Sequence, residues 1–503
     1  MFTTRRRFIE AAVAGGTLAG MSDLGFLATL PRVSAEETKT KGIVSLNSDI
    51  EPLVRLLEET PRERLLEEVA SRIRTGTTYK EVLAALLLAG VRNVQPRPVG
   101  FKFHAVLVVN SAHLASISCP EEHRWLPIFW ALDYFKDSQA QDARQGDWTM
   151  APVDEAAVPD ASKAKDLFVE AMNEWDEAKA DAAAAGLART GKSAEVYELF
   201  SRFGCRDFRD IGHKAIYVAN SWRTLDHIGW EHAEPVLRSL AYALLEHGDG
   251  HPVRDDLDAD RPGRKNLERA KTIGAGWQEG KPDDQATSEL LATLHGGSAD
   301  DACQQVVEML NRGVAPQSIW DALLVGSGEL LARQSGIVSL HAVTSSNALY
   351  YAYRANSDDS LRRLLLLQAA AFVPLFRGAM QGRGRLADVD LRSLSPAPIA
   401  GGDPLAEIFT DVSGDRTAAA RKTLGFLQNQ GDAKAFVDAA RLLVFLKGDN
   451  AHDYKFSSAL LEDYTHLSPG WRERYLASGV FNLRGSGDRD NKLVERTRAA
   501  IAG

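Results

Sequence analysis

Residues 341–376 read HAVTSSNALYYAYRANSDDSLRRLLLLQAAAFVPLF, and this stretch decides the fold because it contains two apolar segments joined by a short polar connection. Apolar residues recur in both segments at steps of three and four, which is the spacing of one helix face. Asp358 and Asp359 stand where the second segment begins, and carboxylates in a first helical turn complement the helix dipole. The stretch predicts a helical hairpin whose first helix begins at His341.

The opening of this hairpin occurs twice more, as HAVLVVNSA at residues 104–112 and HKAIYVANSW at residues 213–222. Each copy pairs a histidine with an asparagine six or seven residues later: His104 with Asn110, His213 with Asn220, and His341 with Asn347. The copies start 109 and 128 residues apart, whereas solenoid repeats recur every 20 to 50 residues or so. We therefore expect a compact bundle in which three equivalent hairpins converge, each with a first helix that begins at its histidine.

The rest of the chain has the same helical pattern. Residues 50–76, IEPLVRLLEETPRERLLEEVASRIRTG, and residues 300–333 place apolar side chains at helical spacing. In TTYKEVLAALLLAG, residues 77–90, the threonines suit an N-cap, and Gly90 predicts the end of the helix. Alternating strand patterns with hairpin turns are not found. The sequence predicts an all-α fold.

Residues 1–35 differ in composition from the remainder. TRRRFIE at residues 4–10 carries the pair Arg5 and Arg6, an apolar stretch follows at residues 11–30, and VSA precedes Glu36. These features predict a cleaved twin-arginine signal peptide and a periplasmic or other extracytoplasmic location, with no stable membrane span once the signal is removed. The twin-arginine route carries folded proteins, often with a cofactor inserted, which makes a bound metal or organic group more plausible.

Residues 36–503 are expected to form a single all-helical domain. Residues 405–503 are a candidate helical sub-block, and residues 137–165, 248–286 and 391–404 are predicted to be loops because they are rich in Gly, Pro, Asp and Arg. The three cysteines are widely spaced, which excludes a disulfide framework.

Composition and missing motifs narrow the ligand class. The formal net charge is −9 and no basic arm is present, so nucleic acid is a poor partner and a small-molecule substrate is expected. The sequence contains no GxGxxG between a strand and a helix, no GxxxxGK[ST] and no GxSxG, which excludes a Rossmann-type NAD or FAD site.

Three histidines from three hairpins suit two kinds of chemistry. Neutral imidazoles are common ligands of zinc, copper and iron, and a metal site is expected to use His104, His213 and His341, with His227 and Glu231 or Asp226 as further ligands. The same three histidines also suit acid–base catalysis in an apolar pocket. The remaining histidines without repeated context are predicted to lie on the surface or in loops: His123, His295, His452 and His466.

SLHAVTSSNALYYAY, residues 339–353, resembles the LHAVTxxHAL signature of the questin oxidase-like family, and the two earlier histidine hairpins resemble its His-rich helices. The resemblance covers about 250 residues in three blocks. It implies an all-helical monooxygenase, since members include fungal enzymes that oxidise polycyclic aromatic polyketides with NADPH. This chain has Asn347 at the signature's second histidine, and its export signal conflicts with a supply of NADPH.

Three hypotheses follow. In the first, an exported oxidoreductase oxidises a flat aromatic substrate with dioxygen in a pocket lined by His104, His213 and His341, while the asparagines Asn110, Asn220 and Asn347 position ring oxygens. In the second, the histidines bind a transition metal. In the third, the protein is a non-catalytic helical scaffold and the histidines are structural.

Overall fold

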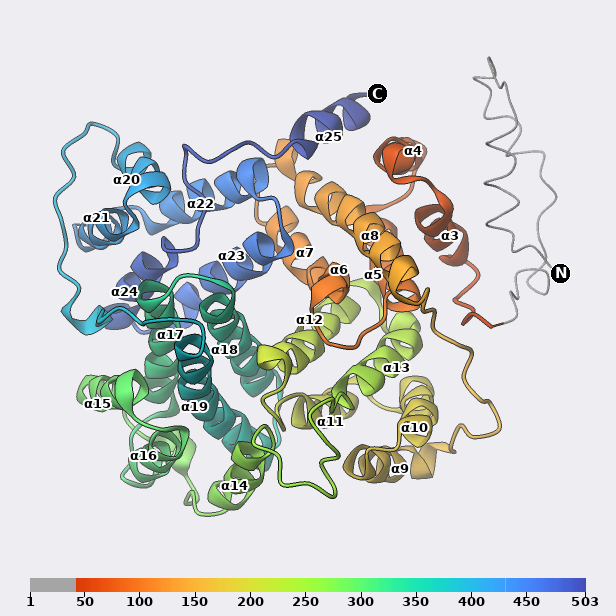
Figure 1. Cartoon of the computed structure of the whole chain (residues 1–503), viewed down its shortest axis with the longest axis horizontal. Helices are drawn as coiled ribbons and strands as arrows, with labels where there is room; N and C mark the ends of the chain where they lie inside the picture. The colour runs from red at the N-terminus through yellow and green to blue at the C-terminus, as the bar shows by residue number, and fades with distance from the viewer. Residues whose placement is uncertain (1–41, 430) are drawn as a thin grey trace. The chain divides into compact units, whose positions relative to one another are not determined.

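The computed structural model describes residues 42–429 and 431–503, which fold into helices joined by loops (Figure 1). Within these residues the only strand-like pairing is an isolated bridge between Lys281 and Val314. The prediction of an all-α fold is confirmed. Residues 42–503 form one compact unit, and the predicted signal peptide at residues 1–35 lies outside the described residues.

The N-terminal helices pack around α5, which contacts α3, α8 and α6. Thr78 caps α5 in a capping box with Glu81, as the sequence predicts. Gly90, however, does not end α5: a Cβ there would lie 2.8 Å from Val106 Cγ2, so glycine allows α6 to approach closely. These helices are α3 (Glu51–Glu59), α4 (Arg62–Arg74), α5 (Tyr79–Asn93), α6 (His104–Leu107), α7 (Val109–Ile117) and α8 (Leu126–Gln145).

The second group packs α10 between α9 and α13, and α12 between this group and the next. The loop predicted at residues 137–165 is shorter in the structure, because α8 continues to Gln145 and only residues 146–160 are irregular. The helices of this group are α9 (Ala161–Glu174), α10 (Glu177–Thr190), α11 (Ser193–Gly204), α12 (His213–Ile228) and α13 (Ala233–Leu244).

In the third group, α17, α18 and α19 bury most of their residues. The segment predicted as a loop at residues 248–286 contains α14, so that prediction is wrong in part. Helix α19 has the length and composition of a membrane span, yet 78% of its apolar window is buried inside the molecule. The helices are α14 (Arg261–Ala270), α15 (Asp284–Gly296), α16 (Ala299–Asn311), α17 (Pro316–Arg333), α18 (Ile337–Ala355) and α19 (Asp359–Gln381).

The C-terminal helices pack on the rest of the fold: α23 contacts α18, α7 and α6, and α24 contacts α17. Figure 1 shows α23 in the middle of the molecule beside α18. This group comprises α20 (Pro404–Gly414), α21 (Arg416–Gln428), α22 (Ala433–Lys447), α23 (Ala451–Asp463), α24 (Pro469–Gly479) and α25 (Leu493–Ala502).

The three predicted hairpins are the helix pairs α7–α8, α12–α13 and α18–α19, and the helices of each pair are in contact. His213 is the first residue of α12, as expected, whereas His104 begins the separate four-residue helix α6 that precedes α7. His341 is not a helix start, because α18 begins at Ile337, one turn earlier. The histidine of the third copy therefore projects from inside a helix rather than from its end.

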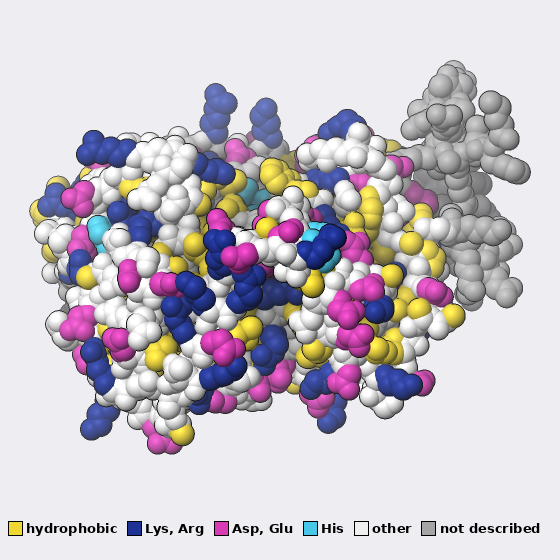
Figure 2. Space-filling view, turned by 60° about the horizontal axis from the view of Figure 1, so that its bottom comes forward, with side chains coloured by type: hydrophobic (Ala, Val, Ile, Leu, Met, Phe, Trp, Pro, Cys, Tyr) yellow, Lys and Arg dark blue, Asp and Glu magenta, His cyan; other side chains and the backbone are white. Residues whose placement is uncertain are grey.

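Charged side chains of both signs are intermixed over the face of the molecule in Figure 2, with hydrophobic side chains between them. The face shown does not gather basic side chains into one large patch.

Candidate functional site

Four histidines from four helices meet in the interior: His104 on α6, His213 on α12, His341 on α18 and His452 on α23. We call these four residues the histidine cluster. The ring centroid of His104 lies 5.0 Å from that of His213 and 4.6 Å from that of His452. The ring centroid of His341 lies 4.3 Å from that of His213 and 5.1 Å from that of His452. The predicted convergence of the three repeated histidines is therefore present. A fourth histidine, His452, joins them, although the sequence predicts it at the surface or in a loop.

Backbone carbonyls fix the tautomer of three of these rings. The Nδ1 atom of His104 donates to the Phe101 carbonyl at 2.7 Å, that of His341 donates to the Ile337 carbonyl at 2.5 Å, and that of His213 donates to the Asp210 carbonyl. A carbonyl only accepts hydrogen bonds, so each Nδ1 carries the proton and each neutral ring leaves a lone pair on Nε2. Partners of this kind are what orient metal-binding histidines.

The loops that supply two of these carbonyls have unusual backbone conformations. Phe101 has φ 48° and Asp210 has φ 48°, and Ile211, a β-branched residue, has φ 46°. Such left-handed conformations cost about 1–3 kcal/mol each outside glycine and persist where the surrounding structure enforces them. In both loops a residue with positive φ, Phe101 or Asp210, lies three positions before the histidine and supplies the carbonyl that accepts from Nδ1.

Burial keeps the four imidazoles uncharged. His104, His213 and His341 are at most 5% exposed. Burial, with smaller effects from Lys455 and neighbouring histidines, holds the pKa of each of these three well below the usual value near 6.5. Burial and then Lys455 lower the pKa of His452 to about 3. All four rings are thus neutral at physiological pH, the form in which imidazole binds metals.

Lys455 lies beside the cluster on α23, with its Nζ 3.4 Å from His341 Nε2. Its side chain is 2% exposed, and burial alone holds the pKa of its amine well below the usual value. An uncharged amine is compatible with four neutral imidazoles, whereas an ammonium ion without a carboxylate would be costly to bury.

The spacing of the ring nitrogens fits a metal ion. His104 Nε2 and His213 Nε2 lie 3.0 Å apart, although both are acceptors in the tautomer that their Nδ1 partners impose. Two nitrogens bound at about 2.0–2.1 Å to one ion, at angles of 90–109°, lie roughly 2.9–3.4 Å apart. His104, His341 and His452 each offer a ring nitrogen within 4.8 Å of the other two. The Nε2 atom of His452 is buried and has no hydrogen-bond partner.

A surface pocket of about 300 Å³ reaches the cluster at His452. Its polar lining includes Arg416 and Arg484 together with Asn450 and Asn482. Arg484 is paired with Asp449 and Asp453, whereas the hydrogen bonds of Arg416 go to backbone carbonyls of Val412 and Phe481. His452 therefore connects the buried histidines to a pocket that is open to small molecules.

The other predicted site residues are distributed differently. Asn110 Nδ2 donates to Asn220 Oδ1 at 3.5 Å, so these two asparagines meet, while Asn347 points to Glu462 and Asp463 instead. His227 packs on His113 with centroids 4.2 Å apart. Among the described residues, the group whose ligand atoms are close enough for one metal consists of His104, His341 and His452, so the predicted ligands His213, His227 and Glu231 lie outside it. Gly229 ends α12 and turns the chain between His227 and Glu231.

His452 was missed because it lies in no repeat. The available signal was its spacing from Lys455, since residues three apart share one face of a helix. No protein-family model, curated protein or solved structure matches the chain. The buried imidazoles themselves are what point to a function.

Proposed function

We propose that the histidine cluster binds one first-row transition-metal ion and that the protein is a metal-dependent oxidoreductase acting on a small organic molecule. The observation that carries the proposal is the pair His104 Nε2 and His213 Nε2, two proton-free acceptors only 3.0 Å apart. Two lone pairs at this distance repel unless an electrophile lies beside both. An all-imidazole donor set favours copper, iron or zinc over magnesium or calcium, which prefer oxygen ligands.

The roles of the residues follow from their positions. His104, His341 and His452 would hold the ion, with His213 beside His104. The Nδ1 atoms of His104, His213 and His341 are committed to backbone carbonyls, so these three would bind through Nε2. His452 borders the surface pocket and would be the ligand next to an incoming substrate. When bound, a redox-active metal ion supplies electron transfer to or from the substrate.

The assignment to oxidation rather than hydrolysis rests on the resemblance of residues 339–353 to the questin oxidase-like signature. That resemblance also supports a flat aromatic substrate and dioxygen. The twin-arginine signal predicted at residues 1–35 would agree with a metal inserted before translocation.

Metal analysis of the exported, purified chain tests this function. The wild type is expected to hold about one equivalent of metal, and His104→Gln and His341→Gln to lose it while His466→Gln retains it. His466 is a suitable control because it lies in a different pocket. Equal metal content in cluster and control variants, or stability losses without any metal loss, would leave the histidines with a structural role and overturn the proposal.

A second function is favoured by one observation. His213 and His452 lie at the N-terminal ends of α12 and α23, and the positive end of a helix dipole stabilises a negative charge such as a phenolate. This would suit a metal-free oxygenase. Its weakness is that imidazoles with such lowered pKa values are poor proton acceptors near neutral pH. Oxygen consumption with a phenolic substrate after metal removal would establish it.

A further inference from the structure

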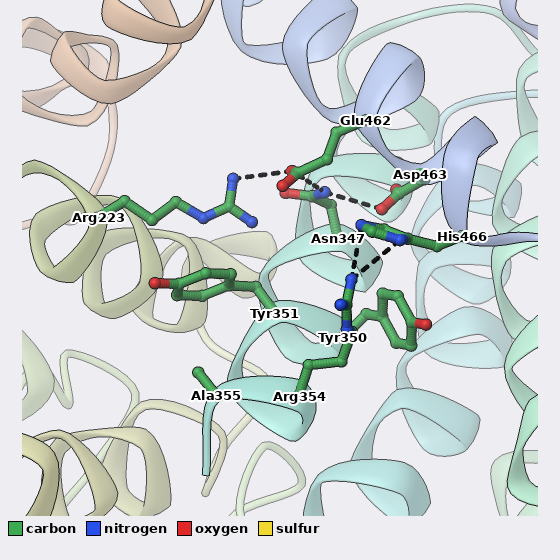
Figure 3. Close-up of a pocket in the computed structure, with 9 residues that line it drawn as sticks. All are labelled: Arg223, Asn347, Tyr350, Tyr351, Arg354, Ala355, Glu462, Asp463 and His466. Atoms are coloured by element: carbon green, nitrogen blue, oxygen red, sulfur yellow. Dashed lines mark hydrogen bonds and ion pairs between the residues drawn. The ribbon is translucent and has the colours of Figure 1, made fainter.

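A second pocket lies at the other ends of the helices that carry the histidines. Its volume is about 350 Å³, within the range of small-molecule sites. Figure 3 shows its lining, which comes from α12, α18 and α23 and from the turn after α23. We call it the arginine–tyrosine pocket; it is lined by Arg223, Asn347, Tyr350, Tyr351, Arg354, Ala355, Glu462, Asp463 and His466.

The two guanidinium groups have unequal partners. Arg223 Nη1 donates to Glu462 at 2.8 Å, and its side chain is 9% exposed and stacks 4.0 Å from the Tyr351 ring centre. Its Nε is buried without a hydrogen-bond partner. Arg354 contacts the ring of His466 at 2.9 Å, and no carboxylate within ion-pairing distance of Arg354 is found among the described residues. One cation in the pocket is therefore left without a carboxylate.

The acidic side chains do not balance this charge. Glu462 is shared between Arg223 and Asn347. Asp463 is fully buried and accepts hydrogen bonds from Asn347 at 2.8 Å and Tyr475 at 3.1 Å. Burial, with the charge of Glu462 next to it, raises the pKa of Asp463 well above its usual value. Neither acidic side chain pairs with Arg354, since Glu462 pairs with Arg223 and Asp463 accepts from Asn347 and Tyr475.

We propose that the arginine–tyrosine pocket is a binding site for a small organic carboxylate that also bears a hydroxyl or amino group. The carboxylate would pair with Arg354, where planar guanidinium and carboxylate groups fit in bidentate fashion. The hydroxyl or amino group would donate to Glu462, the acceptor at the opposite wall (Figure 3). The tyrosine side chains and Ala355 provide walls for a short carbon skeleton. This site is independent of the metal proposal.

Calorimetric titration of the full exported chain with acetate, L-malate, L-glutamate and inorganic phosphate, each alone, tests the proposal. L-Malate or L-glutamate is expected to bind with 1:1 stoichiometry and at least about tenfold more tightly than acetate, because acetate lacks the second donor. Phosphate binding in preference to the carboxylates, or no binding by any of the four, would overturn it.

Two variants and a control locate the site. Arg354→Gln is expected to weaken binding at least about tenfold through loss of a charge-assisted pair, with the melting temperature little changed because the side chain lies at the pocket mouth. Glu462→Gln should weaken L-glutamate binding more than L-malate binding, because an ammonium group loses more than a hydroxyl when the facing charge is removed. Arg383→Gln, an exposed arginine after α19, should bind as the wild type does. Equal affinities for Arg354→Gln and Arg383→Gln would contradict the assignment.

Discussion

The histidine cluster and the arginine–tyrosine pocket share the three helices α12, α18 and α23, to which the cluster adds α6. The cluster contains imidazoles and an amine, whereas the pocket contains arginines, tyrosines and carboxylates. On α18, His341 faces the cluster, and Asn347 faces the pocket six residues later, about 9 Å along the axis and roughly 120° around it. The cluster end contains uncharged nitrogen donors, whereas the pocket end contains arginines and carboxylates.

The comparison teaches how one helix set can support two electrostatic environments. At the cluster, burial removes charge from four imidazoles and an amine, and backbone carbonyls satisfy the Nδ1 atoms of three of those imidazoles. At the pocket, charges persist because they pair with one another or lie near solvent. A cation is expected where lone pairs converge, and an anion where the Arg354 guanidinium group has no carboxylate partner among the described residues.

The largest effect is expected from removing a cluster histidine. His341→Ala should reduce metal affinity at least about 100-fold, more than the loss typical of outer-shell substitutions, and lower the free energy of unfolding by about 2–4 kcal/mol through the cavity it leaves. His466→Ala in the pocket should retain the metal. Metal titration measures the affinity, and urea unfolding measures the free energy of unfolding. Equal metal loss in the two variants would contradict the proposal that the cluster and not the pocket binds the metal.

Removing the buried amine should act in the opposite direction. Lys455→Met replaces a desolvated amine by an apolar chain of similar length, so the metal-free protein is expected to gain about 1–4 kcal/mol in unfolding free energy. The exposed Lys434→Met should change it by less than about 0.5 kcal/mol. Thermal and urea unfolding compare the two; a Lys455→Met protein that is less stable than the wild type would mean that the amine makes a needed contact.

The cluster should lose stability in acid. Its histidines have folded-state pKa values below the unfolded value near 6.5, so the unfolded chain binds more protons once the pH falls below that value. Unfolding free energy should therefore rise with pH up to about 6.5, by about 1.4 kcal/mol per unit for each histidine. The unfolding free energies of the metal-free wild type and of metal-free His341→Gln can be compared at pH 5, 6 and 7. Their increase per pH unit should be about 1.4 kcal/mol smaller in the variant. An equal increase in both proteins would contradict the prediction.

The pH dependence of stability at the pocket should have the opposite sign to that at the histidine cluster. Asp463 has a folded-state pKa above its unfolded value near 3.8, so its contribution to stability is present at low pH and declines as the pH rises toward the folded pKa. Asp463→Asn cannot ionise, and its stability relative to the wild type should increase with pH over this window. A difference between the two proteins that stays constant from pH 4 to pH 8 would show that Asp463 is ionised in the folded state.

The smallest effect is expected where the questin oxidase-like signature would place a second histidine. Asn347→His adds an imidazole to the pocket rather than to the cluster, because the side chain at this position points to Glu462 and Asp463. Metal stoichiometry should stay at the wild-type value. A second equivalent of metal in this variant would show that the pocket can also bind a metal ion, and would contradict the proposed difference between the two regions.

The sequence by itself determined the helical class, the three hairpins and the convergence of their histidines. Helical spacing of apolar residues is a local property, and repetition of His104, His213 and His341 marks equivalent positions. Local signals were misleading where packing decides: Gly90 predicts a helix end but serves as a contact point for α6, and the loop at residues 248–286 contains α14.

Only the tertiary structure decided which further residues lie beside the three histidines and which predicted site residues lie elsewhere. His452 and Lys455 come from α23, more than 100 residues beyond His341, and neither belongs to a copy of the repeated motif. Asn347 and His227 were themselves predicted site residues, yet the helical rotation of α18 and the turn at Gly229 direct them elsewhere. Burial of the cluster, which sets its protonation, depends on helices packed from the whole length of the described chain, and no local pattern encodes that.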